Sequence, residues 1–165
     1  MILLGLKAER ELRLLASDGG ALKPVATFPI LAASGTLGPK RREGDRQVPE
    51  GEYRAECLNP NSLYHLAIRV SYPNDDDRRA AEADGRTQLG GDIMIHGKSA
   101  SIGCLAVGDA AIEELFILAA RVGTENVEVV IAPSVAPMSD LKPDSPPWLR
   151  ARYESLQSRV DDLTR

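Results

Sequence analysis

Residues 93–109 read IMIHGKSASIGCLAVGD. The stretch holds His96, one of two histidines in the chain, and Cys104, one of two cysteines. It begins as a short strand, passes through a loop of small residues and leads into an amphipathic helix. Glycines and serines let such a loop fold back on itself, and an imidazole beside a thiol lowers the pKa of that thiol. The stretch therefore predicts a strand, loop and helix that could assemble a reactive Cys–His pair.

Gly103 and Cys104 together suggest attack on a carbonyl group. A glycine before a nucleophile lets the main-chain amides of both residues approach a substrate carbonyl, as an oxyanion hole requires. Ser101 could orient the imidazole through its side chain or its carbonyl. Spacing alone leaves open the alternative that His96 is a strand-end histidine and Cys104 a buried thiol.

The chain on both sides of this stretch is rich in strand patterns. Residues 11–17 and 21–34 flank Asp18-Gly19-Gly20, whose glycines suit the tight connection of a β-hairpin. Residues 38–53, GPKRREGDRQVPEGEY, combine glycine, proline and charge without a period and predict a long loop. NVEVVIA (126–132) is a strand of β-branched residues.

Two further segments alternate with the period of a strand. In YRAEC (53–57) the alternation places Cys57 on one face with Tyr53 and Ala55, which predicts a buried cysteine. YHLAIRVSY (64–72) is the clearest strand of the chain. Its two faces carry Tyr64, Leu66, Ile68 and Val70 on one side, and His65, Ala67, Arg69 and Ser71 on the other.

Helices are predicted in the later part of the chain. A short helix begins at a capping aspartate within 75–77, a run without the ligand spacing of a calcium loop. A second helix runs from Asp109, its predicted N-cap, to Gly123. After a proline-rich linker, Ser145 is the predicted cap of a third helix, which we expect to pack back on the domain. A partner-binding or dimer helix is the alternative. Its apolar stripe is Leu149, Tyr153, Leu156, Val160 and Leu163.

Strands first and helices late favour a mainly β or α+β domain over a parallel α/β sheet. The length of 165 residues fits one domain, and a net charge of -4 with interspersed signs gives no support for a nucleic-acid partner. No nucleotide-binding glycine motif occurs, and a metal site that adds Cys57 and His65 lacks the spacing of zinc ligands. We therefore expect no cofactor and no metal. The opening apolar patch is too short for a signal-peptide core or a membrane span.

Three segments in this order carry a resemblance: GPKRREGDRQVPEGEY, NPNSLYHLAIRVSYPN and DIMIHGKSASIGC. They resemble the L,D-transpeptidase (YkuD-type) catalytic domain, and most closely its YafK-like branch, over residues 31–132. The resemblance implies a mainly β fold with a sandwich or barrel-like core and a few helices. With the helical pattern at the end of the chain, it suggests a catalytic domain over 1–133, a proline-rich linker over 134–147 and a C-terminal helix over 148–165.

By position, the resemblance makes Cys104 the nucleophile, His96 its base and Ser101 to Gly103 part of the catalytic signature. Two features depart from the common family pattern. The spacing from histidine to cysteine is short, as in the YafK-like branch. The arginine usually found two residues after the cysteine is missing, because the chain reads Cys104-Leu105-Ala106. Candidates for the substrate contacts are Gly97, Lys98, His65, Arg69 and Ile102.

The function implied by the resemblance is acyl transfer on peptidoglycan stem peptides through a thioester. The partner would be a tetrapeptide stem or a protein-linked tripeptide, and the location the periplasm or cell envelope. Three alternatives remain open: an amidase that releases protein or peptide from diaminopimelate, a catalytically silent wall-binding module, and a cytoplasmic enzyme that acts on another amide.

Overall fold

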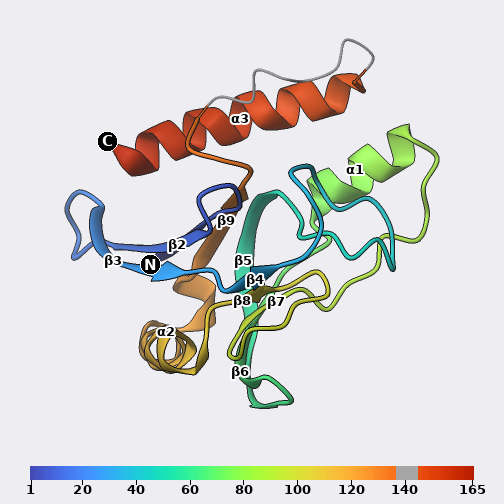
Figure 1. Cartoon of the computed structure of the whole chain (residues 1–165). Coiled ribbons are helices and arrows are strands. Elements are labelled where there is room, and N and C mark those ends of the chain that lie inside the picture. The colour runs from blue at the N-terminus through green and yellow to red at the C-terminus, as the bar shows by residue number, and fades with distance from the viewer. Residues whose placement is uncertain (137–144) are drawn as a thin grey trace.

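The computed structural model describes residues 1–136 and 145–165. Within them, nine strands form one mixed sheet in the order β3-β2-β1-β9-β5-β6-β7-β8-β4 (Figure 1). The strands are β1 (Ile2–Leu6), β2 (Glu11–Ala16), β3 (Lys23–Pro29), β4 (Ala32–Ala33), β5 (Gly51–Ser62), β6 (His65–Val70), β7 (Met94–His96), β8 (Leu105–Ala106) and β9 (Glu128–Ala132). The helices are α1 (Asp75–Ala83), α2 (Asp109–Val122), the short 3₁₀ helix η1 (Thr124–Asn126) and α3 (Pro147–Thr164). None of these helices is long and apolar enough to cross a bilayer.

Strand β5 joins the two halves of the sheet. Its first residues, 51–54, pair with β9, and the rest of the strand pairs with β6. Two pairs, β1 with β9 and β7 with β8, are parallel, and the others are antiparallel. The predicted mainly β or α+β fold with a C-terminal helix is confirmed, as is the hairpin of β2 and β3.

Two apolar clusters hold the sheet and helices together. The inner cluster joins side chains of both halves of the sheet with one face of α2. The outer cluster joins the opposite face of β1 and β9 to α3, so α2 and α3 lie on opposite sides of that half of the sheet (Figure 1). Helix α3 contributes Tyr153, Leu156, Val160 and Leu163. The predicted stripe therefore packs back on the domain. Each such buried side chain contributes about 1.5–3 kcal/mol.

A buried ionic contact ties α3 to the long loop before β5. The side chain of Glu50 is fully buried, and its carboxylate accepts hydrogen bonds from Lys7 Nζ at 2.8 Å and from the Tyr153 hydroxyl at 2.6 Å. The Gly38 amide donates to the same carboxylate at 2.8 Å. These contacts join β1, the loop and α3 at one point.

We expect Lys7→Met to destabilise the protein by about 3 kcal/mol, because it leaves the Glu50 carboxylate buried without its cation. Thermal or urea unfolding would measure the change. Lys23→Met is the matched control, since Lys23 is exposed at the start of β3 and should change stability by less than about 0.5 kcal/mol. Equal stability of the two variants would contradict the prediction.

Several local predictions are wrong, each for a structural reason. Cys57 is exposed rather than buried, because the register of β5 against β6 shifts between Ala55 and Cys57 and interrupts the alternation. Helix α1 is capped by Asn74, whose side chain accepts from the Asp77 amide, and not by an aspartate of the run.

The predicted caps of α2 and α3 also differ. Helix α2 has Gly108 as its N-cap, and the Asp109 carboxylate instead accepts from the Lys98 amide at 2.8 Å. Helix α3 follows Pro146 without a side-chain cap, so Ser145 does not cap it. The proposed division into domain, linker and helix stays a prediction, and residues 137–144 of that linker lie outside the described residues.

Candidate active site

The strand register places His96 and Cys104 on one face of the sheet. His96 pairs with Ala67 of β6 and Ala106 of β8, while Ile95 pairs with Leu105. Ile95 and Leu105 point into the inner apolar cluster. Because side chains alternate along strands, His96 and Cys104, which precedes Leu105, point to the opposite face. This register brings the two ends of the predicted loop together.

The His96 ring is fixed in one orientation. It is 2% exposed, its Nδ1 lies 2.7 Å from the Gly97 carbonyl oxygen, and the Tyr64 ring stacks on it with centroids 4.6 Å apart. A carbonyl only accepts hydrogen bonds, so Nδ1 must carry the proton and Nε2 keeps a free lone pair in the neutral ring. Burial lowers the pKa of His96, against the opposing effect of the Gly97 contact. A neutral imidazole with a free Nε2 can act as a base.

The Cys104 thiol is half-buried beside β7. Sγ lies 3.6 Å from the main-chain oxygen of Asp92, to which the thiol donates. Burial raises the pKa of Cys104, as does the Asp92 charge, while the Met94 main chain and Lys40 oppose the shift. Among the described residues no hydrogen bond joins this thiol to the His96 ring. The structure thus differs from the expectation of a lowered pKa, and the resting pair is a neutral thiol and a neutral imidazole.

This electrostatic state predicts the pH dependence of alkylation. Because the pKa of Cys104 is raised, its thiolate fraction grows only as pH rises above about 8.5, the value of a free cysteine. Iodoacetamide modification of a Cys57→Ala variant, followed by mass spectrometry from pH 6 to 10, would measure this profile. A midpoint well below about 8.5 would contradict the resting state described above.

Two serines hold the main chain around Cys104. The Ser101 hydroxyl donates to the Cys104 carbonyl at 2.6 Å and accepts from the Cys104 amide at 3.1 Å. The Ser34 hydroxyl accepts from the Gly103 amide at 2.6 Å, and the Ser34 amide donates to Ser101 Oγ at 3.3 Å. Both amides of the predicted oxyanion hole are therefore occupied by hydroxyl groups. In the described residues Ser101 positions Cys104 rather than the imidazole.

Backbone strain gathers around this loop. Four non-glycine residues have a positive φ between 54° and 76° here: Arg46, His65, Asp92 and Lys98. The Arg46 carbonyl accepts from Ser34, Asp92 receives the Cys104 thiol, and Lys98 lies within the loop. Such conformations are uncommon and gather where function requires them. Their concentration here supports the assignment of the functional site to this face.

The candidate substrate-binding residues differ in their surroundings. Lys98 Nζ donates to the Leu63 carbonyl at 2.8 Å, and His65 Nε2 lies 2.7 Å from a carboxylate oxygen of Glu113, so both anchor the β5–β6 hairpin tip. Ile102 is 71% exposed on the loop. Gly97 packs beneath the hairpin tip.

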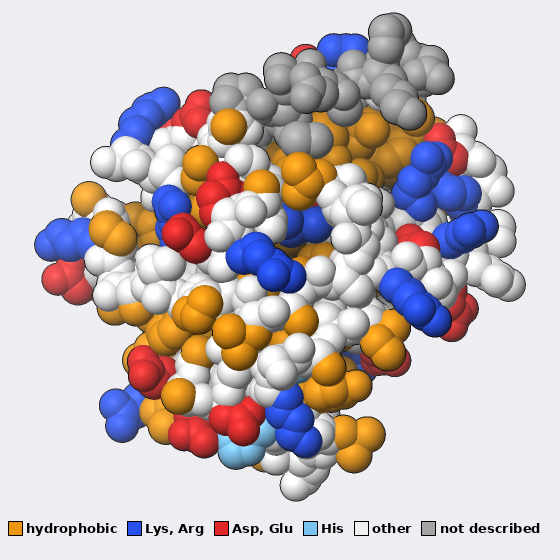
Figure 2. All heavy atoms as spheres, viewed as in Figure 1, with side chains coloured by type: hydrophobic (Ala, Val, Ile, Leu, Met, Phe, Trp, Pro, Cys, Tyr) orange, Lys and Arg blue, Asp and Glu red, His pale blue; other side chains and the backbone are white. Residues whose placement is uncertain are grey.

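Arg69 is the candidate substrate-binding residue that pairs with β7 next to Cys104. It pairs with Met94, whose main chain contacts Cys104, and its guanidinium lies between Glu56 at 2.9 Å and Asp92 at 3.0 Å. Figure 2 shows acidic and basic side chains interspersed over the face drawn, without a large region of one sign.

Three residues of this site were not predicted from the sequence. Ser34 lies 67 positions before Ser101, and no local pattern signals their contact. Asp92 was given no role of its own, although its main-chain oxygen accepts the hydrogen bond of the Cys104 thiol. Tyr64 was predicted to lie on a strand face, and its place before His65 in an alternating segment gave no sign of its contact with His96.

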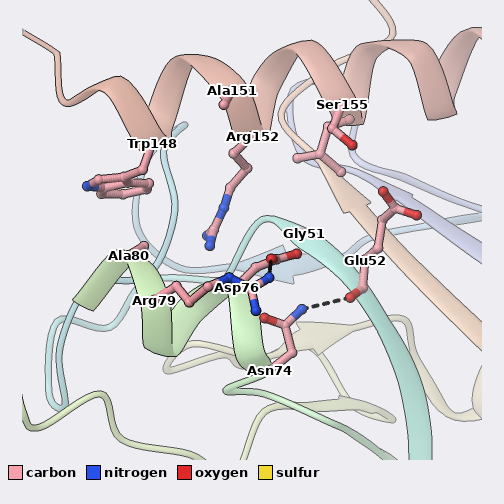
Figure 3. A pocket seen from close by; sticks show the side chains of 11 residues that line it. Gly51, Glu52, Asn74, Asp76, Arg79, Ala80, Trp148, Ala151, Arg152 and Ser155 are labelled. Atoms are coloured by element: carbon pink, nitrogen blue, oxygen red, sulfur yellow. Dashed lines mark hydrogen bonds and ion pairs between the residues drawn. The ribbon is translucent and has the colours of Figure 1, made fainter. Parts of the chain in front are cut away.

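A separate hollow of about 340 Å³ lies between α1, α3 and the start of β5 (Figure 3). Trp148 and Arg152 of α3 face Arg79 and Asp76 of α1 across it. It contains neither His96 nor Cys104, and it lies at the other end of β5 from the hairpin tip. Within residues 1–136 and 145–165, no group of three or more histidine, cysteine or acidic side chains is arranged to hold a metal ion.

Comparison with known proteins agrees with this geometry. The family model of the YkuD L,D-transpeptidase catalytic domain matches residues 4–131. The chain belongs to this family. YafK of Escherichia coli strain K12, provisionally named an L,D-transpeptidase, is 39% identical over 132 residues, which are 77% of this chain and 51% of YafK. The YafK of strain O157:H7 matches equally well. The chain spans about half the length of these relatives.

Solved structures support the same fold. The helical cell shape determining protein Pgp2 of Campylobacter jejuni superposes with a TM-score of 0.65 at 18% identity, over 97% of this chain and 68% of that one. Bd1075 of Bdellovibrio bacteriovorus gives a TM-score of 0.58 at 23% identity, over 99% of this chain and 54% of that one. At these identities the likeness concerns the fold of the YkuD domain alone.

Proposed function

We propose that the protein is a cysteine acyl-transfer enzyme that acts on peptidoglycan stem peptides. The observation that carries the proposal is the neutral His96 ring, fixed through Nδ1 and placed by the strand register on the same face as Cys104. Membership of the L,D-transpeptidase family supports this substrate class. A peptidoglycan substrate would place the protein in the periplasm or elsewhere in the cell envelope.

In the proposed reaction, Cys104 Sγ attacks the carbonyl at the L-centre of diaminopimelate in a tetrapeptide stem. His96 Nε2 takes the thiol proton as the S–C bond forms, which suits a resting pair without a preformed ion pair. The C–N bond to D-alanine then breaks, and His96 gives the proton to the departing amine. The thioester remains on Cys104.

The negative oxygen of the intermediate needs hydrogen-bond donors. We propose the amides of Gly103 and Cys104 for this role. The substrate oxygen would displace the Ser34 hydroxyl from the Gly103 amide and the Ser101 hydroxyl from the Cys104 amide. Ser101 would keep its hydrogen bond to the Cys104 carbonyl and so hold Cys104 in place. The positive φ of Gly103, 107°, is a conformation that favours glycine at this position.

The group that resolves the thioester decides the reaction class. The amine of a second stem would give a crosslink, and a protein lysine would give an attached protein. Water would give a carboxypeptidase on a tetrapeptide stem or an amidase on a protein-linked one. The chain has Leu105-Ala106 where the family has an arginine after the cysteine, and this difference leaves the acceptor of the acyl group open. Hydrolysis is therefore the second candidate. A wall-binding module without chemistry is the third.

Mass spectrometry separates these functions. The protein would be incubated with tetrapeptide muropeptides and, separately, with a lysine-linked tripeptide muropeptide, next to a Cys104→Ala control. Loss of D-alanine with a dimer, in the wild type alone, would establish a transpeptidase. Release of lysine without a dimer would establish an amidase. No change in either substrate would overturn the enzyme proposal and leave the binding module.

A further inference from the structure

A second hollow, of about 440 Å³, lies beside the catalytic face. Strand β6 supplies Arg69 to its lining, β5 supplies Glu56, and α1 supplies Asp75 and Arg78. Ser71 adds a hydroxyl group. The lining thus offers two guanidinium groups and two carboxylates in one small volume.

The charges of this hollow are paired only by exposed contacts. Arg69 is 39% exposed and lies between Glu56, 54% exposed, and Asp92, 77% exposed. Arg78 and Asp75 are 57% and 83% exposed and lie 3.0 Å apart. Ion pairs at such exposures contribute only about 0–1 kcal/mol. A ligand that carries both charges can therefore replace these partners without a large loss of stability.

We propose that this hollow binds the zwitterionic D-centre of the diaminopimelate side chain, with Arg69 holding its carboxylate and Glu56 its ammonium group. Arg78 and Asp75 would supply a second, outer pair of the same signs. This inference rests on the proposed function, which places diaminopimelate at Cys104, and it names how that residue is recognised.

The geometry of the sheet fits this ligand. Arg69, Met94 and Cys104 lie in one row across β6, β7 and the start of β8, and side chains in one row share a face. The Cα atoms of Arg69 and Cys104 are then about 10 Å apart, two strand spacings. The two centres of diaminopimelate are separated by three methylene groups, a span of about 5 Å. With the L-centre at Sγ, the D-centre comes within reach of the Arg69 side chain.

The chemistry of the hollow also selects among stem residues. A guanidinium binds a carboxylate with two parallel hydrogen bonds, and a carboxylate binds an ammonium group. Lysine in the third position of a stem offers the amine without the carboxylate. Amidated diaminopimelate offers the amine with a neutral amide. We therefore expect the free zwitterion to be the preferred ligand.

The test compares three tetrapeptide stems that differ only at this end: diaminopimelate, its ε-amide and lysine. We expect the wild type to turn over the free form with a kcat/KM about 10- to 100-fold above the amide and the lysine form, the range for a hydrogen-bonded charge. Arg69→Gln should reduce this preference to about threefold or less. Arg79→Gln is the matched control, because Arg79 lies on α1 but lines the separate hollow of Figure 3, and it should keep the preference.

A second comparison tests the proposed contact between Glu56 and the ammonium group. Glu56→Gln should abolish the preference for a free over an N-acetylated D-centre amine and leave the preference for the carboxylate. Calorimetric binding of the same stems to Cys104→Ala repeats both comparisons without turnover. Circular dichroism checks that the variants fold. If Arg69→Gln does not fold, the ranking of the stems by the wild type decides whether the D-centre carboxylate is recognised.

The outcomes are distinct. Equal kcat/KM values for the free and amidated stems, or an unchanged preference in Arg69→Gln, would overturn the assignment of this hollow while leaving the acyl-transfer proposal intact. Absence of turnover with every stem would overturn the proposed function. In that case the calorimetric ranking alone would support or reject the hollow as a zwitterion site.

Discussion

Cys104→Ala is expected to reduce turnover of any stem substrate by about 10³- to 10⁶-fold, the range for loss of a covalent nucleophile. The thiol sits one residue before β8, and its main chain is held by Ser101 on both the amide and the carbonyl. Alanine keeps these main-chain contacts, so the loop should remain in place. The mass of an acylated intermediate, seen with the wild type, should disappear with the variant.

Cys57→Ala is the matched control for this substitution. Cys57 is exposed on β5, where it pairs with Arg69 of β6. Its replacement should leave turnover and acylation within about twofold of the wild type and stability within about 0.5 kcal/mol. Retained turnover in Cys104→Ala would show that the reaction runs through another group, and the mechanism proposed above would be wrong.

Gly97→Ala is expected to have the second large effect, although the substitution adds a single methyl group. A Cβ at this position would lie 2.6 Å from an Asp109 carboxylate oxygen, 2.7 Å from the Tyr64 carbonyl oxygen and 3.1 Å from His65 Cβ. The Tyr64 contact is with main chain, so the hairpin tip or the loop must move. Overpacking of this kind costs about 1–3 kcal/mol of stability.

The displacement should also reach His96, the proposed base. The Gly97 carbonyl holds His96 Nδ1, and Tyr64, which the new methyl group would push, stacks on the same ring. A shift of about 1 Å in a catalytic group can reduce turnover about 10²-fold, so we expect a loss of that size in kcat with a smaller change in KM. Steady-state kinetics and thermal unfolding would measure the two effects.

Gly20→Ala serves as the control, because a Cβ there meets only an Asp18 carboxylate oxygen at 3.7 Å, in the β2–β3 turn. It should alter neither kcat nor stability beyond experimental error. Full activity of Gly97→Ala would mean that the hairpin tip yields without moving the imidazole, and the positioning role assigned to Gly97 would be withdrawn.

The elements predicted well were those whose signals are local. Alternation marked β6, β-branched residues marked β9, glycines marked the β2–β3 hairpin, and the apolar stripe of α3 marked the face that packs on the sheet. Strand β1 was not singled out, because it is buried on both faces and so lacks an alternating pattern. Cys57 was placed wrongly because a shift of register is a property of two strands together.

For the candidate site, the sequence indicated the pair proposed to be catalytic but not its surroundings. His96 and Cys104 were found through their loop and through the resemblance of three ordered segments to one family. The hydroxyl of Ser34 on the Gly103 amide joins residues 69 positions apart and has no local signal. The roles of Tyr64 and Asp92 likewise depend on how the hairpin and β7 meet the loop.

Residue types and their spacing predicted the strands and the α3 stripe and marked His96 and Cys104 as a candidate pair, and the resemblance of three ordered segments indicated the family. The strands, the stripe and the loop between His96 and Cys104 follow from periodicity and from the conformations that glycine and serine allow over a few neighbouring residues. The tertiary structure decided the protonation of the pair, since burial raises the pKa of Cys104 and lowers that of His96. It also decided which hydroxyl groups occupy the amides, and it placed Arg69 in the same row of the sheet as Cys104, two strands away. Desolvation and contacts between distant segments arise only once the chain has packed, so no local pattern encodes them.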